Sequence, residues 1–145
     1  MYICIMKRMK MFFLLSLVAA WWGFVSCENK NDKGAEASYA VALQLFEQGK
    51  YRACLDSITL LRDKFPQAIE VRRQALKLWQ DASLKLTQED IARTDSALQA
   101  VTKLYEEAKT IRERNFIGIV KDSLQIRYDA LCGTVRVIHR RQQEK

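Results

Sequence analysis

The chain contains little of what turns and β-sheets require. Its 145 residues include five glycines and one proline, the two residues that punctuate turns most often. So few turns argue against a β-sandwich or a barrel, in which many short strands must be connected. The rest of the composition is rich in Ala, Leu, Gln, Glu, Lys and Arg, which are strong helix formers. The sequence therefore predicts an all-α protein.

Residues that carry catalysis are equally scarce. The one histidine, His139, lies near the end of the sequence beside two arginines, where little would hold it against a partner. The glycines are isolated, so they form no phosphate-binding loop, and no His, Cys, Asp and Glu cluster has metal-site spacing. The acidic pairs at 89–90 and 106–107 are adjacent residues, which splay apart on a helix. We therefore expect no enzymatic activity, no cofactor and no metal, and the sequence identifies no small-molecule substrate.

The positive charge is modest and dispersed. The formal net charge is +7, but three of the 24 basic residues and none of the 17 acidic ones fall within residues 1–26, so the remainder carries +4. Basic and acidic residues alternate along the predicted helices, which is typical of solvated helix faces. A nucleic-acid surface would gather basic residues on one face. We expect no nucleic-acid partner.

Residues 1–26 have the pattern of a signal peptide. Lys7, Arg8 and Lys10 precede an uncharged run, residues 11–26, which ends at Cys27. A helix of about 16 residues spans ~24 Å, short of the ~30 Å hydrocarbon core of a bilayer. This length favours a cleaved signal peptide over a transmembrane helix.

The end of this run resembles the lipobox of bacterial lipoproteins. The residues that carry the resemblance are Phe24-Val-Ser-Cys27, with Phe24 at a position where leucine is usual. The resemblance implies cleavage before Cys27 and lipidation of Cys27, which would hold the protein on a membrane at ~0.8 kcal/mol per buried CH₂. By the same resemblance, Glu28 after the cysteine implies the outer membrane, on its periplasmic or surface side. The alternative is an ordinary signal peptide with Cys27 as a plain thiol.

The first helical segment is predicted over residues 37–66, after a lipidated cysteine and short polar tether at 27–36. Apolar residues at 39, 41, 42, 45 and 46 have the spacing of one helix face. Gly49 is a helix stop signal, and Pro66 ends a second apolar pattern that begins at Tyr51. These signals predict a helical hairpin.

This hairpin resembles a single tetratricopeptide repeat. The matching positions are Ala42, Leu45, Gly49, Tyr51, Cys54 and Pro66. The resemblance implies two antiparallel helices that approach each other at small residues; a hairpin that matches the pattern by chance is the alternative. No second repeat follows, because Ser83 stands where the next turn glycine would be. Since repeats normally bury their core by stacking, the hairpin must pack against the next segment.

Residues 67–145 predict a long helix followed by a C-terminal helix in the same domain. Leu84, Ile91, Leu98 and Tyr105 recur every seven residues, as in a coiled-coil seam. The segment from Gln67 to about Arg114 forms one helix, or two with a break near Leu86–Thr87, where residues 87–90 read as a helix start.

The last helix is predicted to follow a break at Asn115–Val120. That stretch is β-branched and contains a glycine, which favours an extended piece or a turn, and Asp122 or Ser123 would cap the helix after it. A second seam, Leu124, Tyr128, Leu131, Val135 and Ile138, would fold back along the long helix in coiled-coil-like fashion.

Two cysteines, Cys54 and Cys132, remain once Cys4 is removed and Cys27 is lipidated. An envelope compartment permits a disulfide between them, and two separate buried thiols are the alternative. Trp79 and Tyr105 are either core residues or anchors of a binding groove.

The lipobox, hairpin, long helix and second seam together resemble small helical lipoproteins of the Bacteroidetes. That resemblance implies a bacterial envelope location and supplies no catalytic residues. We expect a lipid-anchored, non-enzymatic protein that mediates protein–protein interaction or scaffolding. The alternatives are a self-associating structural spacer and an accessory ligand-binding subunit.

Overall fold

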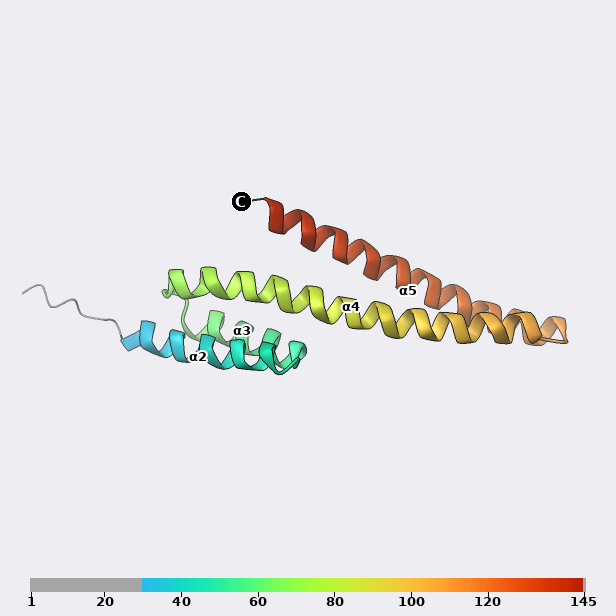
Figure 1. The fold of residues 1–145 in the computed structure, drawn as a ribbon, viewed down its shortest axis with the longest axis horizontal. Helices are drawn as coiled ribbons and strands as arrows, with labels where there is room; N and C mark the ends of the chain where they lie inside the picture. Colours follow the sequence, from blue (N-terminus) through green and yellow to red (C-terminus); the bar gives the residue numbers. More distant parts are fainter. Residues whose placement is uncertain (1–29, 145) are drawn as a thin grey trace, which may run out of the picture. The chain divides into compact units, whose positions relative to one another are not determined.

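The structure of the protein is a computed structural model, and it describes residues 30–144. Residues 1–29, which include the predicted signal peptide and Cys27, lie outside the described part. Within it are four helices (Figure 1): α2 (Lys30–Glu47), α3 (Tyr51–Lys64), α4 (Ile69–Glu107) and α5 (Ile111–Gln143). The all-α prediction is confirmed for these residues. Among the described helices, none has both the length and the apolar content needed to cross a membrane.

Helix α2 begins at Lys30 and not at Ala37, so residues 30–36, assigned to the tether from sequence, are helical. The extra turns are held by packing as well as by backbone bonds. Ala35 is fully buried, and a Cβ at Gly34 would lie 2.9 Å from the Phe65 ring. Tertiary contacts of this kind stabilise a helix in a segment whose polar composition alone does not predict one. The helix therefore starts earlier than the sequence pattern indicates.

The turn between α2 and α3 lies at Gly49, as predicted. Gly49 has a φ of +72°, the left-handed conformation that glycine adopts without steric cost. The amide of Gly49 donates to the carbonyl of Phe46 at 2.9 Å, and that of Lys50 to the carbonyl of Leu45 at 2.9 Å. These two bonds satisfy carbonyls that the end of α2 would otherwise leave open.

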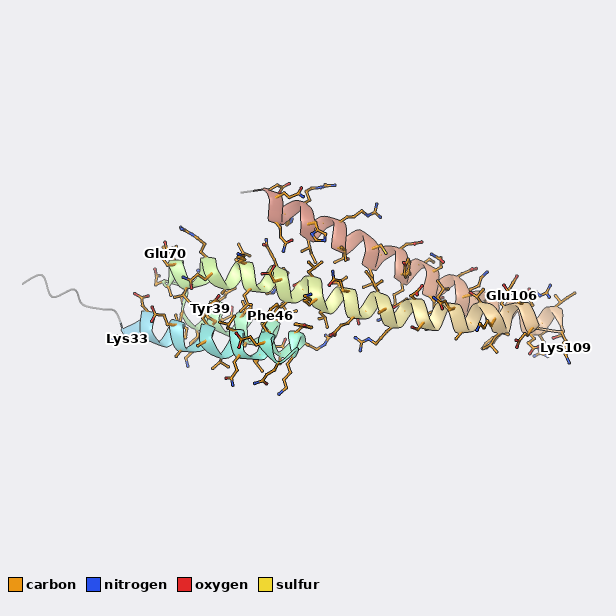
Figure 2. All side chains as sticks on the ribbon, viewed as in Figure 1. Lys33, Tyr39, Phe46, Glu70, Glu106 and Lys109 are labelled. Atoms are coloured by element: carbon orange, nitrogen blue, oxygen red, sulfur yellow. The ribbon has the colours of Figure 1, made fainter. Side chains whose placement is uncertain are left out.

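The core lies where α2, α3 and the first half of α4 meet. Alanines at its centre let the helices approach closely, and larger side chains on α3 fill the space between them. Tyr39 and Phe46 of α2 pack against the same cluster (Figure 2). The hairpin therefore packs on the following helix, as its sequence requires. The buried apolar residues of this core are Ala35, Ala42, Cys54, Ile58, Leu61, Ala68, Val71, Ala75, Leu78 and Ala82.

Helix α4 is a single helix of 39 residues. The Thr87 hydroxyl donates to the carbonyl of Ser83 at 2.7 Å, and the Thr94 hydroxyl donates to the carbonyl of Asp90 at 2.7 Å. Both threonines bond back into their own helix, so no helix starts at Thr87. Of the two alternatives for this segment, the structure has the unbroken helix. The predicted end near Arg114 is wrong, because α4 ends at Glu107 and a turn follows it.

The turn between α4 and α5 lies at residues 108–110. The Thr110 hydroxyl accepts a bond from the amide of Glu113 at 3.2 Å and caps α5. Residues 115–120 are helical, so the predicted break there is wrong. The predicted caps are wrong too, since Asp122 lies inside α5 and the Ser123 hydroxyl donates to the carbonyl of Ile119 at 2.8 Å.

Helix α5 runs back along α4, as the second seam predicted (Figure 1). Near the turn, Gly118 faces the ring of Tyr105, and the amino group of Lys121 lies 4.5 Å from the centre of that ring. Toward the other end, the Gln142 amide donates to the Asp81 carboxylate at 3.0 Å. Contacts between α4 and α5 therefore extend from the turn to the last turn of α5.

Candidate interaction surface

Helix α5 is only thinly covered by the rest of the described protein. Of its 33 residues, Ile138 alone is buried. The seam residues that face α4, including Leu124, Tyr128 and Leu131, are half-buried. A helix that packs on one neighbour can cover one stripe of its surface, so the remaining faces of α5 stay open.

A second apolar stripe follows one of these open faces. Phe116, Ile119, Ile126 and Val137 are 72%, 68%, 70% and 50% exposed. Phe116 and Val137 are three heptads apart and share one heptad position, and Ile119 and Ile126 share another. The two positions are three residues apart, like a and d of a coiled coil, so the four side chains lie on one helix face. We call these four residues the outer stripe of α5. Ser123, Ala130 and Gly133 lie between them on the same face.

Charged residues flank the outer stripe on both sides. Asp122, Asp129 and Arg136 lie along one flank, and Arg127 lies on the other. Within the described residues, neither Asp122 nor Arg136 has an ion-pair partner. Figure 2 shows side chains along α5 that project away from α4 into open space. An apolar stripe with charged flanks is the pattern of a helix face that packs on another helix.

The two cysteines lie apart. Cys54 is fully buried in the hairpin core and Cys132 is half-buried on α5, and both thiols are free. Cys54 lies on α3 and Cys132 on α5, and both of these helices pack against α4. The structure thus has two separate thiols and no bridge. Burial raises the pKa of the Cys54 thiol.

Cys132 interacts with the tyrosine one turn before it. The charge that the Cys132 thiol would carry, and its hydrogen bond to the phenol, raise the pKa of Tyr128. Asp95 of α4 contributes in the same direction to a smaller extent. These groups lie in the seam between α4 and α5, away from the outer stripe.

The two aromatic residues considered as anchors differ in their surroundings. Tyr105 is half-buried in the seam, whereas Trp79 on α4 is 38% exposed and lies outside the core. His139 is exposed on the last turns of α5. In the described residues, no group of three or more His, Cys, Asp or Glu side chains could hold a metal ion.

Shallow hollows flank the helices. One of about 550 Å³ lies between the first half of α4 and the end of α5, lined by Leu76, Gln80 and Gln142 among others. Another, about 430 Å³, is lined by Arg52, Arg93 and residues of α5. Arg93 is already paired with Asp90 at 2.5 Å. Both hollows are open to solvent, and neither contains a residue of the outer stripe.

Comparison of the chain with protein families, with curated proteins and with solved structures finds no match. The surface of the molecule must therefore be interpreted from its own residues.

The outer stripe went unrecognised in the sequence, although a signal for it is present. Residues 117, 124, 131 and 138 repeat every seven positions and face α4, and the outer stripe follows a second seven-residue repeat on the same helix. The glycine and the β-branched residues at 115–120 favour a break, and a break there would leave Phe116 and Ile119 outside any helix face. Two heptad patterns on one helix indicate two packing partners.

Proposed function

We propose that this protein is a lipid-anchored, non-enzymatic helical protein of the bacterial envelope that binds a protein partner through the outer stripe of α5. The observation that carries the proposal is the exposure of Phe116, Ile119 and Ile126, each about two-thirds open on one helix face. Contiguous exposed apolar surface with a charged rim is characteristic of protein-binding sites.

The membrane part of the proposal rests on the sequence of residues 7–27. Basic residues, an uncharged run and Phe24-Val-Ser-Cys27 together support lipidation of Cys27. In cells fed labelled palmitate, the wild-type chain should incorporate label and sediment with membranes. Cys27→Ala should lose the label, and Cys54→Ala should keep it. Label retained by Cys27→Ala would contradict the anchor.

Site-specific crosslinking tests the protein-binding part. A photoreactive phenylalanine analogue at Ile119 should trap a defined adduct in intact envelopes, because this side chain belongs to the outer stripe and is 68% exposed. The same analogue at Lys103, an exposed position on α4, is the matched control. If position 119 gives no adduct beyond that of position 103, the outer stripe is not a binding surface.

A further inference from the structure

We infer that the partner of the outer stripe is a second copy of this chain, whose α5 packs antiparallel to the first. This inference rests on the proposed function, because it names the occupant of the same surface. The argument is that the side-chain sizes and the charges of α5 are complementary to those of a second α5 that runs in the opposite direction.

The side-chain sizes match in one antiparallel register. With a twofold axis level with Tyr128, Ile119 faces Val137 of the second copy, and Ile126 faces Ala130 of the second copy. A large residue thereby meets a smaller one at each of these two pairs, as interdigitated packing between helices requires. In the same register Ser123 faces Gly133, and Phe116 faces Arg140, a cation that can lie over its ring. The axis lies near the middle of α5, so the contact extends over almost the whole helix.

The charges match in the same register. Asp122 of one copy lies beside Arg136 of the other, and the symmetry repeats this pair on the other side of the axis. Two further pairs of opposite sign come together toward the helix ends: Arg112 with Glu144, and Glu113 with Arg141. Because Asp122 and Arg136 are exposed and unpaired in one chain, a second copy supplies each with a partner.

Like charges meet at the axis only. Arg127 faces Arg127 of the second copy there, and Asp129 faces its own equivalent. A parallel pairing fares worse, since it matches Asp122 with Arg127 but sets Arg136 against Arg141 and leaves Glu113 and Glu144 without basic partners. Charge complementarity therefore selects the antiparallel arrangement.

One helix per copy gives a small interface. Contacts below about 1,200 Å² of total buried area are characteristic of weak, reversible association. Attachment of both copies to one membrane would raise their effective concentration and compensate for a weak contact. The expected species is thus a dimer in exchange with the monomer.

A charge-swap experiment on the full-length chain in mild detergent tests the register. Sedimentation equilibrium is measured for the wild type, for Asp122→Arg, for Arg136→Asp and for the double variant. Each single change places like charges together at two symmetric positions and should weaken the dimer about tenfold. The double variant should return close to wild-type affinity. Glu89→Arg, a charge reversal on an exposed part of α4, should leave the dimer unchanged.

The rescue cannot arise within one chain. Residues 122 and 136 are 14 positions apart on one helix, a separation of about 21 Å. A wild-type chain that stays monomeric at ~100 µM overturns the inference, as does a dimer that the single variants do not weaken. Rescue of Asp122→Arg by Arg127→Asp in place of Arg136→Asp would overturn the antiparallel register.

The same variants separate this inference from the proposed function. If the wild type is a monomer while the crosslinker at Ile119 traps a different protein, the outer stripe binds that protein and self-association is wrong. If neither a dimer nor an adduct forms, both proposals fail.

Discussion

Gly118 on α5 lies against the ring of Tyr105 on α4, so closely that a Cβ at residue 118 would stand 3.3 Å from Cε2 of the ring. The Lys121 amino group lies 4.5 Å and the Arg114 guanidinium 5.8 Å from the centre of the same ring. Cations over an aromatic face are attracted to it. One tyrosine thus contacts three residues of the first turns of α5, which fixes how the two helices align after their turn.

Two glycines of α5 should respond differently to alanine. Gly133→Ala should stabilise the protein by about 0.5–1 kcal/mol, because a Cβ there meets nothing within 4 Å and alanine favours helix. Gly118→Ala should gain clearly less, since its methyl group presses on Tyr105. Urea unfolding followed by circular dichroism measures both. Equal gains would show that the Tyr105 ring does not pack on Gly118.

The cap of α5 can be tested by removing one hydroxyl. Thr110→Ala should cost about 1 kcal/mol of unfolding free energy, because the amide of Glu113 loses its acceptor. Ser123→Ala is the matched control and should change stability little, since Ser123 bonds back into its own helix. A larger loss at Ser123 than at Thr110 would place the start of α5 at the position first expected from sequence.

Two apolar residues of α3, one buried and one exposed, allow a controlled test of the core. Ile58 is fully buried and Leu60 is 68% exposed on the same helix. Ile58→Ala should destabilise the protein by about 2–5 kcal/mol through lost burial and the cavity left behind. Leu60→Ala should change the free energy of unfolding by less than about 0.5 kcal/mol. Similar losses in thermal or urea unfolding would contradict the packing of α3 on α4.

The buried thiol should make stability fall at alkaline pH. Burial raises the pKa of Cys54 in the folded protein, so above the ordinary thiol pKa the unfolded chain loses a proton that the folded chain keeps. The stabilisation is complete below that pKa and declines as pH rises toward the folded value. Urea midpoints between pH 7 and 10 should fall less steeply in Cys54→Ala than in the wild type.

The pKa of Tyr128 is also raised, by Cys132, so Tyr128 can contribute to the same loss of stability at alkaline pH. Tyr128→Phe is therefore the control: it removes the contribution of Tyr128 and leaves that of Cys54. Identical pH slopes in the wild type and Cys54→Ala would contradict the contribution of Cys54 to the pH dependence.

In the folded wild type, a thiol reagent should modify Cys132 well before Cys54, since Cys132 is half-buried and Cys54 is not exposed at all.

Local signals predicted the hairpin well. Gly49 adopts the left-handed conformation that only glycine takes freely, and Pro66 follows the end of α3, so both residues acted through backbone geometry. Ala42 and Cys54 are both fully buried, as their small size at helix-spaced positions indicated. Features encoded by one residue's own conformation or size can be read from a single sequence.

The α4–α5 turn could not be predicted in this way. Residues 108–110 contain neither glycine nor proline, and the turn depends on the Thr110 cap and on the seam that brings α5 back along α4. Gly118 carried the stronger local turn signal but serves close helix packing. The start of α2 was likewise missed, because burial of Ala35 decides it. Tertiary contacts outweighed propensity in both places.

The unbroken α4 has a mechanical consequence. At about 1.5 Å per residue, its 39 residues span roughly 58 Å, with the hairpin fixed to the first half and the α5 turn at the far end. No loop interrupts this span, so a force applied near Lys109 reaches the hairpin without slack. Helix α4 is therefore a rigid spacer that fixes the distance between the hairpin and the α4–α5 turn.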